Sequence, residues 1–536
     1  MAPNESLKVQ FNVPMKMRDG TILRGDVYRP EDTQKHPALF LRTYGNKRFM
    51  GHSYLDNIEA VRCGYAVILQ DVRGMFASEG EWKIEETFNV EGPDGYDSVE
   101  WIANQSWCDG NVGTIGGSHQ ALYQWLTALE HPPHLKAISP WIGDIAMMGF
   151  TAPRSGGILP ISSTLSVIPR QAVEIVDRLE KEGKDVSEMR RTVDWARNNR
   201  DELLNFLPLK DLPLTRFERI REMLTKQLRP VTEPELESHR RYHEIMLPCF
   251  HLTGWYDGCH WSVFHNFLNM RQKGGSQLAR EGQYLLVGPW MHGTATPSLG
   301  DINFGVLAGD PGAQISQHIL SFFDKYFKGK DNKIPTIRYF VMGIGEWKNT
   351  VDWPPPQTQW QRFYLHSRGS ANSSGGDGLL SRDEPGSESP DIYIYNPLRP
   401  IPTVGGPLIS GGGVGPGMVA GPFEQSRIEK RNDILCYTTP ELREKIEVTG
   451  PLEFHLFAAS SAKDTDFTAK LIDVYPDGGA FNVAEGIIRA SGRRLTGQKE
   501  LLNPGEVYEF VITMGHTSQC FLKNHRIRID ISSSNF

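Results

Sequence analysis

Short apolar runs alternate with helix-like segments in the N-terminal part of the chain, and this alternation limits the possible folds more than any other feature. Residues 37–43 (PALFLRT), 65–70 (YAVILQ) and 111–116 (NVGTIG) are strand-like runs bounded by turn-forming residues. Segments 55–64 (LDNIEAVRCG) and 97–105 (DSVEWIANQ) have helical character and lie between them. Nearly continuous apolar strands separated by helices predict a parallel sheet that is covered on both faces.

The remainder of the chain shows three further patterns. Residues 145–245 carry amphipathic helices on a charged background without strand signals, as expected for a helical cap inserted over an active site. Strand-like runs return within 246–350 (LPCFHLTG and YLLVG), so this part and residues 1–144 are expected to share one α/β core. From 351 to 536 short alternating runs recur between turn residues, among them RFYLHS, DIYIYN, KIEVTGPLEFHLFAAS and RIRIDISSS. This last pattern predicts a β-sandwich or jelly roll.

Composition excludes several classes of protein. The 536-residue chain exceeds what one hydrophobic core supports, so two or three domains are expected. Its 39% hydrophobic and 23% charged residues are typical of soluble globular proteins. A formal charge of -7 without a concentrated basic face argues against binding of nucleic acid. No apolar run reaches the roughly 18 residues of a membrane span, and no apolar segment of a secretory signal follows the first charged residues.

The cysteines and histidines lack the spacing of metal sites. Six cysteines are scattered without CxxC spacing: Cys63, Cys108, Cys249, Cys259, Cys436 and Cys520. Reduced thiols in a cytoplasmic protein explain this distribution better than a disulfide framework or a zinc site. His260 and His265 are five residues apart, which is poor geometry for a shared metal, and no HExxH motif occurs. We therefore predict a cytoplasmic protein without a metal or another cofactor.

The stretch GTIGGSHQAL (113–122) contains the first half of the G-x-S-x-G turn that carries a serine nucleophile in many enzymes. A strand-like run precedes Ser118 and an apolar helical stripe follows it, so the expected context of strand, tight turn and helix is present. Gly116 supplies the glycine before the serine, but Gln120 replaces the glycine expected after it. Taken alone, the motif is also compatible with a structural serine.

Two further residues follow strand-like runs in the order that a catalytic triad requires. In this architecture the acid and the histidine come after the serine. Asp257 lies in the loop GWYDG after one run, and His292 lies in MHG after the next. A helical stretch between them allows a right-handed return, which places both loops at the sheet edge where Ser118 also lies. Each residue alone is more often a turn or packing residue, and their joint order favours catalysis.

Other histidines compete with His292 for the role of base. His119 directly follows the serine. His251 lies in the middle of a predicted strand, while His260 and His265 start or lie within a predicted helix. None of the last three is as well placed as a histidine in a loop at the carboxyl end of a strand.

Several stretches in sequence order look like the signatures of one enzyme family: MKMRDGTILRGDVYRP (15–30), GYAVILQDVRGMFASEGEW (64–82), EGPDGYDSVEWIANQSWCDGNVGTIGGS (91–118), PPHLKAISP (132–140), GWYDG (254–258), VGPWMH (287–292), NPLRPIPTVGG (396–406) and DTDFTAKLIDVYPDG (464–478). Through them the chain resembles the cocaine-esterase and X-Pro dipeptidyl-peptidase-like α/β-hydrolases over almost its whole length. The resemblance implies an α/β-hydrolase core, an inserted helical cap and a C-terminal jelly roll.

The resemblance also implies roles for individual residues. Ser118 is the nucleophile, Asp257 orients the base and His292 is that base. The oxyanion hole is formed by the hydroxyl of Tyr44, in LRTYGNKR after the first core strand, and by the backbone N–H of His119. Without the resemblance, Tyr44 would be read as a tyrosine packed at a strand end.

The chain departs from the family pattern in several places. His119 and Gln120 stand beside the nucleophile, where the family usually has an aromatic and a small residue. Cys259 and His260 follow the triad aspartate, where members that prefer α-amino acid esters carry acidic residues, so recognition of a substrate ammonium group is not expected. The long N-terminal extension of true X-Pro peptidases does not precede this sequence. The sequence ends at ISSSNF, which leaves open whether the last edge of the jelly roll is finished.

These observations lead us to expect a serine hydrolase that cleaves an ester or amide bond of a small molecule through an acyl-enzyme. Two alternatives remain open: acyl transfer or cyclisation of a biosynthetic intermediate in the same pocket, and a catalytically silent protein that binds a small ligand. No nucleic acid or membrane is expected as a partner, and the sequence does not predict the oligomeric state.

Overall fold

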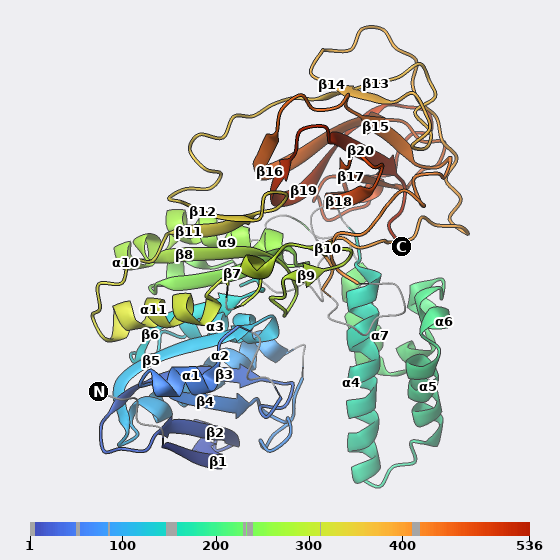
Figure 1. Cartoon of the computed structure of the whole chain (residues 1–536). Helices are drawn as coiled ribbons and strands as arrows, with labels where there is room; N and C mark the ends of the chain where they lie inside the picture. The colour runs from blue at the N-terminus through green and yellow to red at the C-terminus, as the bar shows by residue number, and fades with distance from the viewer. Residues whose placement is uncertain are drawn as a thin grey trace. The chain divides into compact units, whose positions relative to one another are not determined.

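The structure is a computed structural model that describes residues 6–49, 54–83, 86–145, 158–228, 232, 240–310, 312–409 and 419–536. The chain forms two compact units, which are treated separately below (Figure 1). The first unit comprises Met1–Met147, His239–Leu299 and Asn303–Thr358, and the second comprises Met148–Ser238, Gly300–Ile302 and Gln359–Phe536. The finer division into core, cap and jelly roll at residues 144, 245 and 350 stays a prediction.

A 10-stranded sheet forms the centre of the first unit, with the strand order β1-β2-β4-β3-β5-β6-β7-β8-β11-β12. The strands from β4 to β11 in this order run parallel, whereas β1, β2 and β12 are antiparallel to their neighbours. The bounds are β1 (Leu7–Lys16), β2 (Ile22–Pro30), β3 (His36–Thr43), β4 (Ala66–Asp71), β5 (Cys108–Gly117), β6 (Leu135–Trp141), β7 (Cys249–Tyr256), β8 (Gln283–Met291), β11 (Ile337–Val341) and β12 (Glu346–Thr350).

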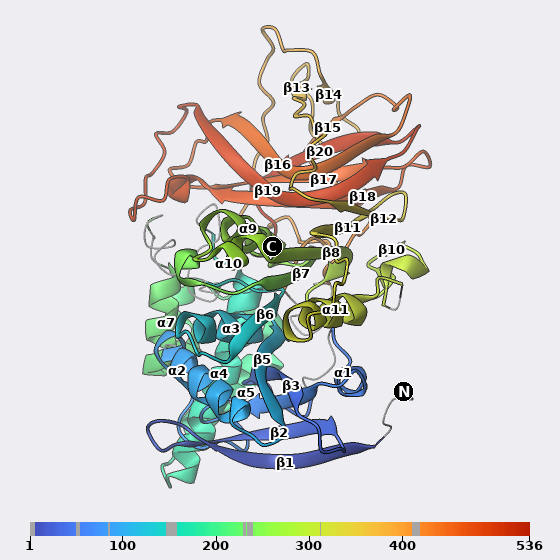
Figure 2. The same cartoon turned by 90° about the vertical axis from the view of Figure 1, so that its left-hand side faces the viewer.

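Helices cover both faces of this sheet, as the continuous apolar strands predict. Successive side chains of a strand point to opposite faces. In β3, Leu39 and Leu41 accordingly belong to one buried cluster, and Ala38 and Phe40 belong to another. Figure 2 shows α1 and α11 on one side of the sheet and α2 and α3 on the other. The helices are α1 (Asn57–Arg62), α2 (Thr87–Ala103), α3 (His119–Leu129), α9 (His260–Lys273), α10 (Gln277–Glu281) and α11 (Ile315–Phe327).

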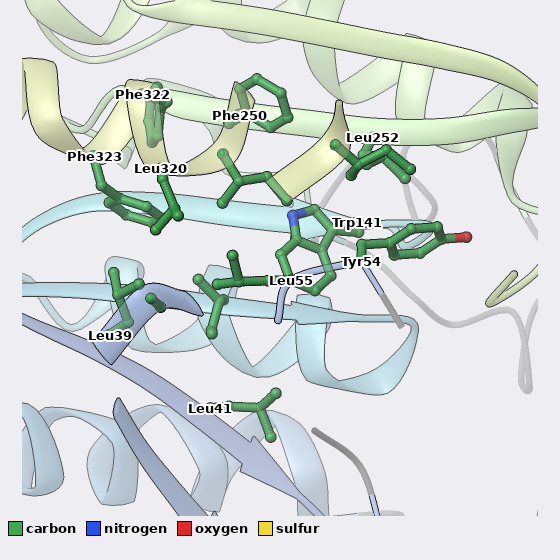
Figure 3. Packing of buried hydrophobic residues seen from close by; sticks show 14 of the residues in the cluster. Leu39, Leu41, Tyr54, Leu55, Trp141, Phe250, Leu252, Leu320, Phe322 and Phe323 are labelled. Atoms are coloured by element: carbon green, nitrogen blue, oxygen red, sulfur yellow. The ribbon is translucent and has the colours of Figure 1, made fainter. Parts of the chain in front are cut away.

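The cluster beneath α11 reaches the carboxyl ends of the strands (Figure 3). Phe322 of α11 packs on Phe250 of β7 with ring centroids 5.7 Å apart. Further along, the ring of Tyr54 lies 5.7 Å from that of Trp141 and 6.4 Å from that of Trp290, measured between centroids. Since Trp141 ends β6 and Trp290 lies near the end of β8, this aromatic packing fixes the sheet edge to which the predicted site residues belong.

Helix α2 is longer than its apolar spacing predicts. The sequence indicates a helix over 97–105, but α2 already begins at Thr87 and contains Pro93. The additional turns carry glycine and polar residues, which give no apolar period. One of these glycines has a packing role, because a Cβ atom on Gly95 would lie 2.0 Å from the Thr127 hydroxyl of α3. The two helices can therefore approach closely only with glycine at this position.

The second unit contains amphipathic helices and two β-sheets, as predicted. Its helices are α4 (Ile161–Lys181), α5 (Ser187–Asn198), α6 (Arg200–Leu204) and α7 (Glu218–Leu228). A 6-stranded sheet has the order β13-β14-β15-β20-β17-β18, and β16 pairs with β19. These strands are β13 (Tyr364–His366), β14 (Leu379–Ser381), β15 (Leu435–Thr438), β16 (Ile446–Ala458), β17 (Asp466–Val474), β18 (Ala480–Arg489), β19 (Tyr508–Phe521) and β20 (Arg526–Ser532).

The two sheets of this unit pack face to face through apolar side chains. Phe467 of β17 and Phe510 of β19 have ring centroids 4.7 Å apart. Strand β20, the last strand described, pairs with β15 on one side and β17 on the other. It is therefore an interior strand and does not form an edge of this sheet.

One predicted strand is wrong. Residues 391–396 (DIYIYN) alternate in polarity but form no strand. In a core strand the apolar residues of the alternation are buried, but here they are exposed: Ile392 is 74% exposed and Ile394 is 85% exposed. The Asp391 carboxylate instead accepts hydrogen bonds from a backbone amide and two side-chain hydroxyls, and the Tyr393 hydroxyl bonds to a serine. Side-chain hydrogen bonds thus hold this segment in place of a backbone ladder.

In the part of the chain that the structure describes, no helix combines the length and the apolar character needed to span a bilayer.

Candidate active site

The predicted site residues all follow parallel strands at the carboxyl edge of the sheet. Tyr44 follows β3, Ser118 follows β5, Asp257 follows β7 and His292 follows β8. In the sheet, β3 neighbours β5 and β7 neighbours β8, with β6 between the two pairs. The fold therefore brings residues that are distant in sequence to one edge, where ligands of open α/β sheets usually bind.

Ser118 occupies a strained turn between β5 and α3. Its backbone dihedrals are φ 60° and ψ -124°, and φ is positive although serine carries a Cβ atom. Such conformations cost about 1–3 kcal/mol and persist where surrounding structure enforces them. Here the Ser118 N–H donates to the Trp141 carbonyl at 3.0 Å, and Gly143 passes close to the turn. A Cβ on Gly143 would lie 2.8 Å from the Ser118 carbonyl oxygen. This is the geometry of a nucleophile elbow.

The unusual Gln120 is accommodated within this turn. Its side chain is 7% exposed and folds back, so that its Oε1 accepts a hydrogen bond from the Gly117 N–H at 3.0 Å. A Cβ on Gly116 would lie 2.7 Å from Gln120 Cβ, and Gly116 has φ +134°. Glycine is thus required at position 116, because a Cβ atom would clash with Gln120 and because φ is positive. Position 120, by contrast, accepts a glutamine, whose side chain bonds to the turn.

Gln124, one helical turn further on, joins three buried groups beneath the elbow. Its Nε2 donates to the Gly116 carbonyl at 2.9 Å. Its Oε1 accepts from the Ser139 N–H at 3.0 Å and the Thr114 hydroxyl at 3.2 Å. These bonds link β5, β6 and α3, and sequence analysis gave no indication of them because a glutamine in a helical stripe carries no distinctive signal.

We expect Gln124→Leu to lower the free energy of unfolding by about 3 kcal/mol, because each buried polar group left without a partner costs about 1–3 kcal/mol. The midpoint of urea denaturation measures this loss. The control is Gln277→Leu, since Gln277 is exposed on α10. Equal midpoints for the two variants would contradict the bracing role of Gln124.

A hydrogen-bonded pair of Asp257 and His292 forms the most buried part of the candidate site. The Asp257 side chain is fully buried and that of His292 is 11% exposed. Asp257 Oδ1 lies 2.8 Å from His292 Nδ1 and also accepts from the Cys259 N–H at 2.8 Å. Its Oδ2 accepts from the Thr253 hydroxyl at 3.0 Å. Both carboxylate oxygens are therefore held, and the imidazole is oriented through Nδ1.

The electrostatics of this pair favour an ionised aspartate. Burial opposes ionisation of Asp257, but the charge and hydrogen bond of His292, with the bonds from Cys259 and Thr253, outweigh it and lower the pKa of Asp257. Burial acts to lower the pKa of His292, yet the neighbouring carboxylate reverses this and raises that pKa above its ordinary value of 6.5. The carboxylate thus stabilises a positive charge on the imidazole.

Tyr54 positions the loop that carries His292. Its hydroxyl accepts a hydrogen bond from the Gly293 N–H at 3.2 Å and lies 3.5 Å from the Met291 carbonyl oxygen. Tyr54 itself is fixed by the aromatic packing described above. Residues on both sides of His292 are therefore anchored to the buried core, a contact that no sequence motif indicates.

Tyr44 and His119 lie against each other. Their ring centroids are 3.9 Å apart with an interplanar angle of 35°. Trp82 packs on Tyr44, with ring centroids 5.3 Å apart. His119 Nε2 lies 3.1 Å from the Thr43 hydroxyl. The imidazole of His119 thus stacks on the ring of Tyr44 and supports it.

Ser118 and His292 both lie in the described part of the chain, and no hydrogen bond joins the Ser118 hydroxyl to the His292 imidazole. The nitrogen that faces Asp257 is Nδ1, which leaves Nε2 as the nitrogen that could accept the serine proton. Catalytic hydrogen bonds are often long without substrate and shorten in the complex.

The competing histidines have other partners. His251 is fully buried in β7, with Nε2 2.8 Å from a glutamine oxygen, and burial lowers the pKa of His251 to about 4. His260 Nδ1 lies 2.8 Å from the backbone carbonyl of Asp257. His265 Nδ1 lies 3.0 Å from a tyrosine hydroxyl. These contacts are typical of structural histidines, as their predicted positions in a strand and a helix suggested.

The parallel sheet, its helices on both faces and the strained serine turn define an α/β-hydrolase fold. Comparison with known proteins gives the family. Residues 19–294 match X-Pro dipeptidyl-peptidase (S15 family), and residues 329–536 match the X-Pro dipeptidyl-peptidase C-terminal non-catalytic domain. The chain therefore belongs to the S15 family, and it is a serine hydrolase with an α/β-hydrolase core and a C-terminal β domain. This confirms the resemblance found in the sequence.

A curated relative covers almost the whole chain. Cocaine esterase from a Rhodococcus species (strain MB1 Bresler) is 35% identical over 542 residues, which are 98% of this chain and 91% of the relative. Two solved structures have the same fold. An α-amino acid ester hydrolase superposes with a TM-score of 0.75 at 21% identity, covering 100% of this chain and 91% of that one. An aminopeptidase from a marine Thaumarchaeota archaeon gives 0.71 at 22% identity, covering 99% and 89%.

Proposed function

We propose that Ser118, Asp257 and His292 form the catalytic triad of this hydrolase. The observation that carries the proposal is the buried hydrogen bond between Asp257 and His292, at the same sheet edge as the strained turn of Ser118. The order of the three residues after β5, β7 and β8 is that of the α/β-hydrolases.

In the first half of the reaction, Nε2 of His292 takes the proton of the Ser118 hydroxyl as the oxygen attacks the substrate carbonyl. The imidazolium that forms is stabilised by the Asp257 carboxylate, which remains ionised. The same imidazolium then protonates the leaving alkoxide, and an acyl-serine remains. In the second half, His292 deprotonates a water molecule that attacks the acyl-serine and releases the acid.

The negative charge on the carbonyl oxygen needs hydrogen-bond donors. We assign this role to the Tyr44 hydroxyl and to the backbone N–H of His119. Their support is position: Tyr44 follows the strand next to β5, and His119 is the first residue of α3 after the nucleophile. The stacking of the His119 imidazole on Tyr44 holds the phenol ring in place.

The proposed substrate is a small-molecule ester. The similarity to cocaine esterase over 98% of the chain supports ester cleavage, and no observation favours acyl transfer or a silent binding role. Cys259 and His260 follow the triad loop, so the chain offers no carboxylate there for a substrate ammonium group. A cytoplasmic location and the absence of nucleic-acid and membrane partners stay predictions of the sequence.

Labelling with a fluorophosphonate tests the proposal. The reagent should form one covalent adduct per chain, and peptide mass spectrometry should locate it on Ser118. The Ser118→Ala variant should remain unlabelled while keeping its folded circular dichroism spectrum. A wild-type protein that hydrolyses esters but is labelled on a different serine would overturn the assignment. Hydrolysis in H₂¹⁸O, followed by mass analysis of the acid, separates hydrolysis from internal acyl transfer.

Tyr44→Phe should lower kcat by roughly 10²–10³ with a much smaller change in KM, as for the loss of one oxyanion donor. The phenylalanine keeps the ring that stacks on His119, so the variant isolates the hydroxyl. Steady-state kinetics with an activated ester measure the effect. Tyr96→Phe is the control. It also removes a phenol hydroxyl, but the Tyr96 ring lies on α2 and contacts Arg18, which is not a candidate site residue. If both variants retain wild-type kcat, the Tyr44 hydroxyl is not an oxyanion donor.

A further inference from the structure

Asp257, Cys259 and His292 form a compact group of three different metal-ligand types. A carboxylate oxygen, the cysteine sulfur and a ring nitrogen all lie within 4.8 Å of one another. Asp257 and Cys259 are buried and His292 is partly buried. The sequence gave no sign of such a site, because two ligands come from the turn after β7 and the third from the loop after β8. Spacing motifs such as CxxC detect only ligands that are close in sequence.

The ligand set suits a thiophilic divalent cation. Zinc binds cysteine sulfur at about 2.3 Å and histidine nitrogen or carboxylate oxygen at about 2.0–2.2 Å, commonly with three protein ligands and one water. Ligand atoms at such distances stand roughly 3–4 Å apart in a tetrahedral site. The present separations of at most 4.8 Å therefore need only small side-chain rotations. Magnesium and calcium prefer oxygen ligands and fit this group poorly.

We propose that this group binds Zn²⁺ or a similar thiophilic cation and that binding switches the hydrolase off. Cys259 loses its thiol proton to solvent on binding. His292 binds through Nδ1, the nitrogen that now faces Asp257, so the ring proton must reside on Nε2. A protonated Nε2 cannot accept the Ser118 proton. The cation thus takes the place of the Nδ1 proton between His292 and Asp257, and the base is lost because the remaining ring proton is on Nε2.

The inhibitory consequence rests on the proposed role of His292, whereas the binding of the cation does not. The structure supports binding in a second way. Asp257 is already fixed by the Thr253 hydroxyl and the Cys259 N–H, so its carboxylate is oriented before a cation arrives. Such supporting hydrogen bonds are typical of metal sites.

Cobalt provides a readout of binding that does not depend on activity. Co²⁺ added to metal-free protein should give a thiolate-to-cobalt charge-transfer absorption that saturates at one ion per chain. Cys259→Ser should abolish this absorption. Cys63→Ser should retain it, because Cys63 is the exposed cysteine and tests adventitious thiol binding. Absorption that disappears in Cys63→Ser and persists in Cys259→Ser would overturn the site.

Zinc inhibition of ester hydrolysis tests the consequence. Wild-type activity should fall with added Zn²⁺ and return with a chelator. Cys259→Ser should raise the half-inhibitory concentration at least about 10-fold, relative to its own metal-free rate, since even the loss of a supporting residue costs 10–100-fold in affinity. Cobalt absorption without inhibition would overturn the switch and count against His292 as the base. Equal inhibition of both proteins, without the absorption, would overturn the metal site and leave the proposed triad untouched.

Discussion

Ser118→Ala will lower kcat for ester hydrolysis by about 10⁶-fold, the loss seen when the nucleophile of an intact triad is removed. The reason is geometric as well as chemical. Ser118 stands in a turn with φ 60°, a conformation that the neighbouring strand and Gly143 enforce and that presents its side chain at the sheet edge. No other hydroxyl can take its place in that turn. Steady-state rates with a chromogenic ester measure the loss.

A second serine variant provides the matched control for this experiment. Ser321→Ala removes a hydroxyl from α11, which lies on a face of the sheet rather than at its carboxyl edge. It should hydrolyse the ester at the wild-type rate, and both variants should keep the wild-type melting temperature. A Ser118→Ala protein within 10-fold of wild type would show that another residue carries the chemistry, and the mechanism would be wrong.

Asp257→Asn should lower kcat by about 10⁴-fold, because an asparagine offers an amide N–H where the imidazole needs an acceptor and so favours the wrong tautomer. The carboxylate is fully buried and accepts the His292 Nδ1–H at 2.8 Å. The substitution therefore changes the hydrogen bond with little change in volume. Rates compared on the high-pH plateau of each protein, where His292 is neutral in both, isolate this effect.

The same variant changes the pH dependence in a defined direction. The base acts in its neutral form, so kcat/KM rises with pH as His292 loses its proton. The Asp257 carboxylate raises the pKa of His292 above 6.5, so this rise should lie above pH 6.5 in the wild type. Without the carboxylate, burial dominates and the rise should move to lower pH.

Asp109→Asn is the control for both effects, since Asp109 lies in β5 at the opposite end of the strand from Ser118. Its pH profile should coincide with that of the wild type. An Asp257→Asn profile that stays in place or moves to higher pH would contradict the pairing of Asp257 with His292.

The core strands β3, β4, β5, β7 and β8 could be predicted because they are largely buried on both faces. Runs such as 37–43 and 65–70 are mostly apolar, and they appear as β3 and β4. The segment 391–396 misled for a physical reason: its alternation is real, but its polar members face inward and make side-chain hydrogen bonds. Alternation alone does not state which face is buried.

The candidate site was predictable in outline only. Ser118, Asp257 and His292 follow the parallel strands β5, β7 and β8, which places them at one edge because parallel strands end at the same edge. What holds them could not be predicted. The bonds of Gln124 beneath the elbow and the approach of Cys259 to His292 depend on side-chain directions, which spacing along the chain does not determine.

A crystal structure of the phosphonylated enzyme tests the central claim most directly. We predict that the phosphorus is bonded to Ser118 Oγ, that His292 Nε2 lies within about 3.2 Å of this oxygen, and that Tyr44 and the His119 N–H reach the phosphonyl oxygen. An imidazole far from the serine oxygen in that adduct, with Asp257 still bonded to its Nδ1, would contradict the account.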